Sequence, residues 1–423
     1  MNQLIQVFEF ETLKANDTRY FTSESIGLKV MNTLWQYNDT HHNMYFEGVR
    51  NGVRFKNYVG VLQVGSVTIE ILPKADKNIG NSGDKKTWHT VLLHMLAKCK
   101  RIKVDAVSDA ALRQRNNSLL DLYFGIFIQE VNMLLGQGLV KQYRKYSGNI
   151  KALKGQLQFS QHIQQNSIHK ERFFTKHQVY DQNHLINQIL YQTLLVLKQM
   201  THQSVLSDAI NRTLFRFPEM RTPNITKSSF TSLKLGRKTA SYAEALKISK
   251  MILFNYSPDI RGGSEQMLAL LFDMNKLWEE YVYRALAKYQ NDCFKVSFQN
   301  GTKFWEHKRI KPDIVIQFKK MGIDNTWETV VIDTKWKMID PAHPSDADLK
   351  QMYAYNMYWN APKSMLLYPT NNHIVTTFGN FHKGRPEVNQ CKLGFIEVLK
   401  DNKLNADLAR DIIHLLDLGL SIN

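Results

Sequence analysis

The spacing of hydrophobic positions changes twice along the chain. Near the N-terminus, residues 4–13 (LIQVFEFETL) and 59–75 (VGVLQVGSVTIEILPKA) alternate or run apolar and are rich in β-branched side chains, which predicts strands. Between them, QYNDTHHN and RNGVRF carry the small polar residues typical of turns. The first 85 residues are therefore predicted to form a strand-rich region.

From about Thr87 to Tyr256 the apolar positions recur with helical spacing. Residues 118–139 predict a long helix that ends near Gly136 or Gly138, and residues 181–200 predict another. Glycines break this pattern at the sequence SPDIRGGSE, near Gly262. Residues 86–262 are thus expected to form a mostly helical middle region.

Beyond this break the pattern alternates between helix and strand. A helix is predicted over residues 265–290, then strands over 294–299, 313–318 and 329–336, a helix over 346–359, and strands over 364–369 and 392–398. Such alternation favours a separate C-terminal α/β domain over residues 263–423. The expected fold class is α+β and multidomain.

The composition adds a basic character to this picture. Among 423 residues, 55 are Lys or Arg and 38 are Asp or Glu, which gives a formal net charge of +17 and favours a polyanion such as nucleic acid as partner. Three distant cysteines form no CxxC pair, so a reducing compartment fits. No signal peptide or membrane-spanning run is evident, and a cytoplasmic protein is expected.

Basic residues concentrate in the segment between the two central helices. From Lys141 to Lys176 the chain carries eight basic residues and one acid, Glu171, with Tyr143 and Tyr146 interleaved. This segment is either a solvated linker or a surface for a phosphate backbone or an acidic partner. The candidate binding residues are Lys141, Arg144, Lys145, Lys151 and Lys154.

Candidate chemistry lies in the C-terminal domain, in the stretch VVIDTKWK (330–337). Asp313 opens one predicted strand, and twenty residues later Asp333 and Lys335 share one face of the next, because residues i and i+2 of a strand point the same way. The opposite face, with Val330 and Ile332, can pack on a core. Two carboxylates can hold Mg²⁺, and a lysine beside them can stabilise a phosphodiester transition state.

These residues resemble the PD-(D/E)xK nuclease superfamily in the pattern Pro312-Asp313…Asp333-Thr334-Lys335. On the following predicted helix, Gln351 and Tyr355 lie one turn apart and resemble the QxxxY element of the RecB-like branch. The resemblance implies a further acid on the preceding helix; the matching position is Glu279, with its neighbour Glu280 as the second choice. It also implies a Mg²⁺ site at Asp313 and Asp333, with Gln351 and Tyr355 orienting the site or contacting DNA.

The chain as a whole resembles the McrC family, the nuclease subunits of McrBC modification-dependent restriction systems. FEFETL, VGVLQVGSVTIEILPKA, LVKQYRKYSGNIKALKGQLQFSQHI and YDQNHLINQILYQTL carry this resemblance in the family's order. It implies DNA cleavage together with a separate AAA+ GTPase that recognises methylated DNA, and an N-terminal region that docks on that motor and stimulates GTP hydrolysis. GNSGDKKT (80–87) lacks the glycine spacing of a P-loop and is expected to be a loop, so no nucleotide is expected on this chain.

Two other functions remain possible at this point. The chain could be a non-catalytic adaptor that activates the GTPase, although an adaptor has no need of the Asp, Asp and Lys set. It could also be a stand-alone RecB-like nuclease, which would cleave without a GTPase but would not need the long N-terminal half.

Overall fold

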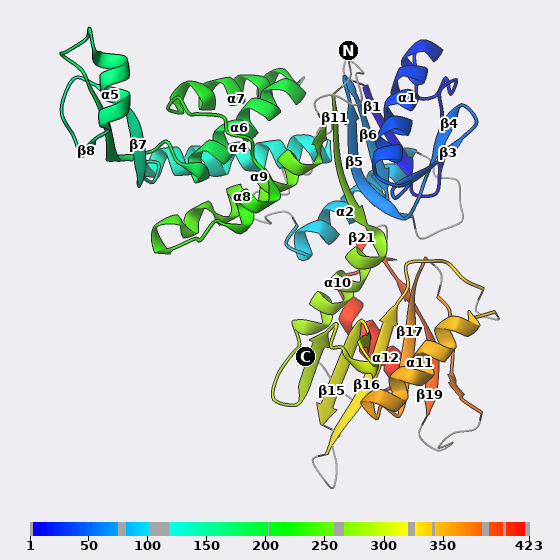
Figure 1. Cartoon of the computed structure of the whole chain (residues 1–423). Coiled ribbons are helices and arrows are strands. Elements are labelled where there is room, and N and C mark those ends of the chain that lie inside the picture. The colour runs from blue at the N-terminus through cyan, green and yellow to red at the C-terminus, as the bar shows by residue number, and fades with distance from the viewer. Residues whose placement is uncertain are drawn as a thin grey trace. The chain divides into compact units, whose positions relative to one another are not determined.

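The structure of the chain is a computed structural model of residues 1–423 (Figure 1). It describes residues 3–74, 82–101, 118–201, 203–257, 266–319, 326–340, 343–371, 373–382, 389–400 and 403–418. The predicted break at Gly262 lies outside these residues, as do Gly80 and Asn81 of the predicted loop. From Ser82 onward that loop is instead the start of a helix.

The chain divides into two compact units that are not consecutive in sequence. Unit 1 comprises Met1–Gln3, Gln63–Val67 and Leu120–Leu270; unit 2 comprises Leu4–Leu62, Thr68–Leu119 and Leu271–Asn423. The N-terminal strands and the C-terminal domain, expected as separate domains, thus belong largely to one unit. The expected mixture of helices and strands is confirmed.

The described residues of the N-terminal part, 3–74 and 82–101, are rich in strands, as predicted, and include the helices α1 and α2. A five-stranded sheet has the order β1-β6-β5-β11-β10, and a three-stranded sheet has the order β2-β4-β3. The elements are β1 (Gln3–Phe8), β2 (Thr12–Lys14), α1 (Glu24–Thr40), β3 (Phe46–Val49), β4 (Gly52–Phe55), β5 (Tyr58–Val64), β6 (Val67–Leu72) and α2 (Ser82–Lys98). Helix α1 begins where Ser23 accepts a hydrogen bond from the Ile26 amide, and it buries Val30, Leu34 and Tyr37.

Unit 1 is mostly a helical bundle with one projecting hairpin. Its helices are α4 (Leu119–Gln137), α5 (Phe159–Asn166), α6 (Leu185–Met200), α7 (Ser204–Arg216), α8 (Lys227–Thr231), η2 (Arg237–Tyr242) and α9 (Ala243–Asn255). Helix α4 confirms the predicted long helix. It is apolar and long enough to span a membrane by composition alone, but 56% of its most apolar window is buried inside the protein, as in the core helix of a globular unit.

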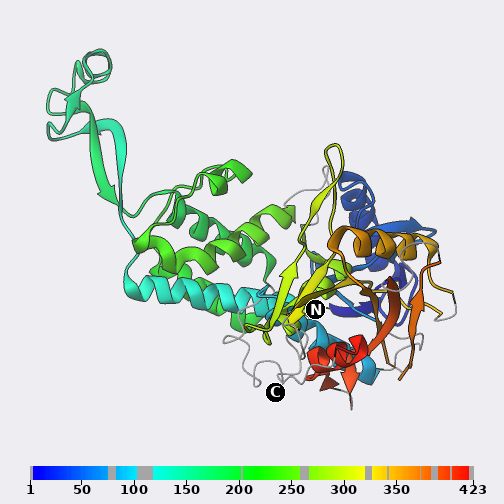
Figure 2. The ribbon, with the colours of Figure 1, turned by 90° about the horizontal axis from the view of Figure 1, so that it is seen from below.

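The basic segment is an ordered hairpin, so its interpretation as a linker is wrong. Strands β7 (Gln142–Ile150) and β9 (Phe173–Asp181) pair antiparallel over their full lengths, from Gln142 opposite Asp181 to Ile150 opposite Phe173. Strand β8 (Gln156–Leu157) and helix α5 lie near the tip. Figure 2 shows this hairpin extending well beyond the helices of unit 1.

The C-terminal domain is a six-stranded mixed sheet of order β12-β15-β16-β17-β19-β18. Strands β12, β15 and β16 are antiparallel, whereas β16, β17 and β19 are parallel. Helix α11 covers one face, and α10 and α12 lie on the other (Figures 1 and 2). The bounds are α10 (Met274–Ala287), β12 (Phe294–Phe298), β13 (Thr302–Trp305), β14 (Lys308–Ile310), β15 (Ile314–Lys319), β16 (Trp327–Thr334), α11 (Asp346–Trp359), β17 (Lys363–Thr370), β18 (Phe378–Asn380), β19 (Gln390–Glu397), β20 (Leu399–Lys400), β21 (Lys403–Leu404) and α12 (Leu408–Leu416).

The helix predicted over residues 265–290 is wrong in its first part. Residues 267–273 (MLALLFD) form strand β11 (Met267–Asp273), which pairs with β10 (Tyr256–Ser257), and the helix begins only at Met274. A short apolar run fits a buried strand as well as a buried helix. The Asp273 side chain, which accepts a hydrogen bond from the Asn275 amide, is the N-cap that divides the two elements.

Candidate active site

The strand pairing brings the two predicted aspartates together. Ile314 pairs with Ile332 in the antiparallel β15–β16 ladder, so Asp313, one residue earlier, lies beside Asp333, one residue later. The Asp313 carboxylate accepts hydrogen bonds from the Thr334 amide (2.7 Å) and hydroxyl (3.0 Å). This pair of bonds fixes Asp313 against the end of β16.

From Val330 to Thr334, strand β16 is buried on both faces. Val331 packs in a core cluster with Met352 and Tyr355 of α11, while Val330 and Ile332 are also buried. Asp333 is itself only 2% exposed. A charged group at such a position requires a partner or a ligand, because an unpaired buried charge is strongly destabilising.

Lys335 supplies that partner. Its ammonium lies 2.6 Å from the Asp333 carboxylate and 3.8 Å from that of Asp348. The Lys335 amide donates to the Leu367 carbonyl, which holds the backbone after β16 ends. Asp348 also pairs with Lys337 at 2.7 Å, so it anchors the segment that carries Lys335.

Helix α11 places Gln351 and Tyr355 as predicted, one turn apart. The Gln351 amide donates to the Tyr355 hydroxyl (2.7 Å), which donates to the Lys311 carbonyl (2.9 Å), and the Gln351 oxygen lies 3.4 Å from the Lys335 ammonium. These bonds connect α11 both to Lys335 and to the residues just before Asp313.

The two candidate acids on α10 occupy different surroundings. Glu279 is 8% exposed and accepts a hydrogen bond from the Gln299 amide, whose oxygen accepts from Lys311. Glu280 pairs instead with Arg101 at 2.8 Å and with Arg284 at 2.7 Å. The geometry therefore favours Glu279 as the acid directed toward the aspartates, and Glu280 as part of a structural ion-pair cluster.

The electrostatics of the aspartates reflect their crowding. Burial, followed by the charge of Glu279, raises the pKa of Asp313 to about 6. Burial, followed by the charge of Asp313, raises the pKa of Asp333 to about 6, although Lys335 opposes this shift. Asp313, Asp333 and Glu279 are thus crowded together, and Asp333 and Glu279 are buried, an arrangement that a cation would stabilise.

The donor set fits Mg²⁺ better than a metal that takes a complete protein cage. Carboxylate oxygens are the ligands that a hard cation prefers, and Mg²⁺ commonly keeps several waters beside one or two carboxylates. In the described part of the chain, no cluster of three or more His, Cys, Asp or Glu side chains has the arrangement of a full metal site. Asp313 and Asp333 are the residues that would hold the ion.

A tryptophan pair next to the site was not anticipated. Trp336, which follows Lys335, packs on Trp278, which precedes Glu279, with ring centroids 5.3 Å apart. The Trp336 indole donates at 2.6 Å to the carboxyl of Glu9, directly after β1. No spacing in the sequence links Glu9 to a residue 327 positions away, so only the folded chain reveals this contact.

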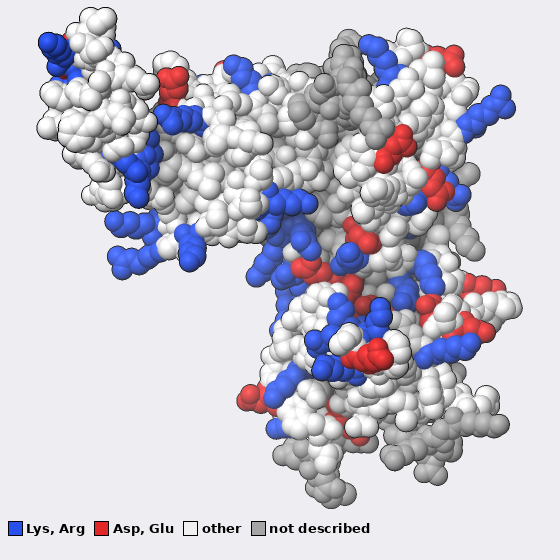
Figure 3. Space-filling view, in the orientation of Figure 1, with Lys and Arg blue, Asp and Glu red and all other residues white. Residues whose placement is uncertain are grey.

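The exposed hairpin carries the other candidate binding residues. Lys141, Lys145, Lys151 and Lys154 are exposed, whereas Arg144 forms a bidentate pair with Asp181 across the strands. On the face in Figure 3, most of the charged side chains on the hairpin and the nearby helices are Lys or Arg, although an acidic group lies among them. Tyr143 stacks on Tyr180 and remains 71% exposed.

Comparison with known proteins identifies the type of fold first. At 16% identity, the chain aligns over 98% of its length, and over 99% of the matched chain, with a TM-score of 0.69, to a half-complex of Thermococcus gammatolerans McrB AAA+ hexamers with bound McrC. A second structure, the T. gammatolerans McrBC complex, aligns over 68% of this chain and 88% of the other, at 16% identity and a TM-score of 0.50. The fold is thus one found in McrBC assemblies.

The family follows from the sequence match. A family described as McrBC 5-methylcytosine restriction system component matches residues 53–369, and the chain belongs to this family. It is also 23% identical over 171 residues to the type IV methyl-directed restriction enzyme EcoKMcrBC of Escherichia coli K12. That match covers 40% of this chain and 49% of the relative, so the chain spans about half the length of this curated relative.

Proposed function

We propose that this chain is the DNA-cleaving subunit of a modification-dependent restriction complex, and that it hydrolyses phosphodiester bonds with Mg²⁺ in its C-terminal domain. The observation that carries the proposal is the convergence of Asp313, Asp333 and Lys335, with Glu279 nearby, at one end of the sheet. This set matches the PD-(D/E)xK pattern in order along the chain and in residue type.

Each side chain has a distinct role in the proposed reaction. Asp313 and Asp333 would hold the cation, which when bound would supply Lewis acidity and make a coordinated water more acidic. Lys335 lies beside Asp333 and stabilises the negative charge that develops on the phosphate. Glu279 is an accessory acid, while Gln351 and Tyr355 hold Lys335 and the Asp313 segment in place.

The partner assignment rests on family membership and on the fold. The related T. gammatolerans assembly contains McrB AAA+ hexamers with bound McrC. We infer that this chain likewise acts with an AAA+ GTPase, stimulates its GTP hydrolysis, and leaves recognition of the modified base to that partner. The protein is expected to act in the cytoplasm, where DNA and GTP are available.

Asp333→Ala and Lys335→Ala each test the catalytic assignment. With the GTPase partner and methylated DNA, each variant should lose about 100-fold or more in cleavage rate, the usual scale for a transition-state contact. Lys350→Ala is the control, because Lys350 is an exposed lysine on α11 and its loss removes the same charge, and this variant should stay within about twofold. Normal cleavage by the first two variants would overturn the proposal, and cleavage without the partner would favour a stand-alone nuclease.

Metal binding has a readout independent of cleavage. A cation should relieve the repulsion between Asp313 and Asp333, so Mg²⁺ should raise the melting temperature of the wild-type chain. The Asp313→Asn protein should show a smaller shift or none. An equal shift in both proteins would show that Mg²⁺ binds elsewhere.

A further inference from the structure

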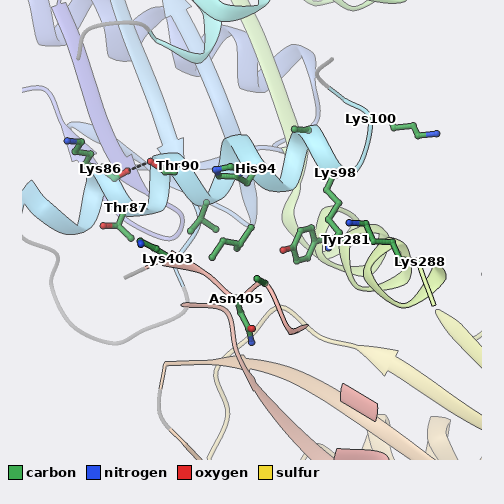
Figure 4. A pocket seen from close by; sticks show the side chains of 14 residues that line it. Lys86, Thr87, Thr90, His94, Lys98, Lys100, Tyr281, Lys288, Lys403 and Asn405 are labelled. Atoms are coloured by element: carbon green, nitrogen blue, oxygen red, sulfur yellow. Dashed lines mark hydrogen bonds between the residues drawn. The ribbon is translucent and has the colours of Figure 1, made fainter. Parts of the chain in front are cut away.

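A second basic region lies in unit 2, between helix α2, helix α10 and strand β21. It is a cavity of about 990 Å³, and Figure 4 shows its lining. Five lysines contribute to it from segments distant in sequence: Lys86, Lys98, Lys100, Lys288 and Lys403. No Asp or Glu is among the described residues that line it. Folding therefore gathers five lysines around a space whose described lining residues include no acid.

Three of the lysines point into the cavity. In Figure 4, Lys98 and Lys288 extend toward each other beside Tyr281, and Lys403 reaches from β21 toward α2. The Lys98 ammonium lies over the Tyr281 ring, 4.7 Å from its centroid, which holds this half-buried side chain in place. In the described part of the chain, none of these three ammonium groups has an ion-pair partner.

The arrangement is costly without a ligand. Burial, followed by the charge of Lys288, lowers the pKa of Lys98, because each positive charge disfavours the other. An anion in the cavity would reverse this effect. Lysine is a common phosphate ligand, since its ammonium acts as a mobile point charge with three donors.

The dimensions favour several phosphates over one. Thr87 and Lys98 both line the cavity and lie eleven residues apart on α2, which is about 16 Å at 1.5 Å per residue. A nucleic-acid strand carries one charge per about 3.4 Å of helix axis, so several phosphates fit this length. Thr87, Thr90 and His94 add polar side chains between the lysines.

The cavity is not part of the cleavage site. Tyr281 and Lys288 lie two and nine residues after Glu279, which places both on the opposite side of α10 at 100° per residue. A phosphate in the cavity is therefore not the one that is cut. Helix α10 thus carries Glu279 on the side of the aspartates and Tyr281 on the side of the cavity.

We propose that this lysine cavity binds a run of closely spaced phosphates in the backbone of a DNA strand, outside the bond that is cleaved. The choice of DNA rests on the proposed function, whereas the phosphate chemistry rests on the lysines alone. A free polyphosphate has the same chemistry, and the experiment below distinguishes the two sources.

The test uses the full chain without divalent metal, so its result does not depend on cleavage. A Lys98→Gln, Lys288→Gln, Lys403→Gln triple variant is compared with a Lys227→Gln, Lys234→Gln, Lys238→Gln control, which removes the same charge from exposed positions of unit 1. The probes are a fluorescent single strand of about 12 nucleotides, a typical site size, and inorganic pyrophosphate followed by phosphorus NMR.

The cavity variant should bind the strand at least tenfold more weakly than wild type. The slope of the logarithm of the binding constant against the logarithm of the salt concentration should be smaller in magnitude by about 2, since each of the three phosphate contacts contributes about 0.7. The control should change less than threefold. Pyrophosphate binding that only the cavity variant loses, with strand affinity unchanged, would assign the cavity to a free polyphosphate. Equal behaviour of both variants toward both probes would overturn the proposal.

Melting temperatures check that the variants fold. The cavity variant should not melt at a lower temperature than wild type, because its substitutions remove the repulsion between the lysines.

Discussion

Glu9, near the N-terminus, is a buried acid that contacts the segment after β16. It is buried, it accepts from Trp336 and from the Lys74 amide, and burial raises its pKa to about 8 despite those two bonds. Because its pKa is raised on folding, the folded chain holds a proton that the unfolded chain releases above about pH 4.5. Stability from this group is therefore present at low pH and is lost as pH rises through 8.

Glu9→Gln should remove this pH dependence. The amide oxygen can accept both hydrogen bonds, and the side chain no longer ionises. Between pH 6 and pH 8, the free energy of unfolding of wild type should fall relative to the variant by up to about 1.4 kcal/mol per pH unit. Urea unfolding of both proteins at several pH values measures the difference. Parallel curves would mean that Glu9 is ionised in the folded protein.

The choice between Glu279 and Glu280 is a second question about single side chains. Glu279→Gln should lower DNA cleavage at least tenfold and leave the melting temperature nearly unchanged, because the amide still accepts from Gln299. Glu280→Gln should lower the melting temperature and leave the cleavage rate nearly unchanged, because it weakens pairs with Arg101 and Arg284 that lie away from the aspartates. Cleavage rates and melting curves of the two proteins decide between them, and the opposite pattern would exchange the roles.

The β7–β9 hairpin is an element that can be removed cleanly. Lys145 pairs with Gln178, so residues 146–177 can be replaced by Asn-Gly, which favours the tight turn that joins two antiparallel strands. Most side chains removed are exposed, so the melting temperature should change little. If the hairpin contacts the GTPase, stimulation of GTP hydrolysis and cleavage should both be lost. If it contacts only DNA, stimulation should persist while cleavage falls.

Elements with a clear hydrophobic period were predicted correctly, and the exceptions have physical causes. The α4 helix and the β15–β16 pair follow from residue spacing alone. Residues 267–273 form a strand because they pair with β10, and the basic segment is a hairpin because β7 and β9 pair over nine residues. Pairing with a distant strand leaves no mark on local periodicity.

The candidate site divides in the same way. Asp313, Asp333 and Lys335 were predictable, because a hairpin places residues at known register, and Gln351 with Tyr355 follows from helical spacing. Asp348, Gln299 and Glu9 were not, since each meets the site through tertiary contacts that no short spacing encodes. The candidate catalytic residues match a motif that can be recognised in the sequence, whereas the residues that position them come close to the site only in the folded chain.

For the whole molecule, unit 2 implies that the C-terminal domain depends on N-terminal residues. Beyond the bond between Glu9 and Trp336, Asn57 donates to Asp273, the Cys99 thiol to the Leu277 carbonyl, and Arg101 pairs with Glu280. A fragment of residues 266–423 would expose apolar surface around Trp278 and Trp336 that is buried in the full chain. It should therefore unfold without a sharp transition, or at a much lower temperature than the full chain.

Fragment complementation tests this dependence directly. Residues 1–119 and 266–423, expressed together, should co-purify and recover a cooperative melting transition, because most of unit 2 is then present. Glu9→Ala in the first fragment should weaken the association, since it leaves the Trp336 indole without an acceptor, whereas Glu24→Ala, at the exposed start of α1, should not. A fragment 266–423 that melts cooperatively at the temperature of the full chain would show that the C-terminal domain is independent of the N-terminal strands.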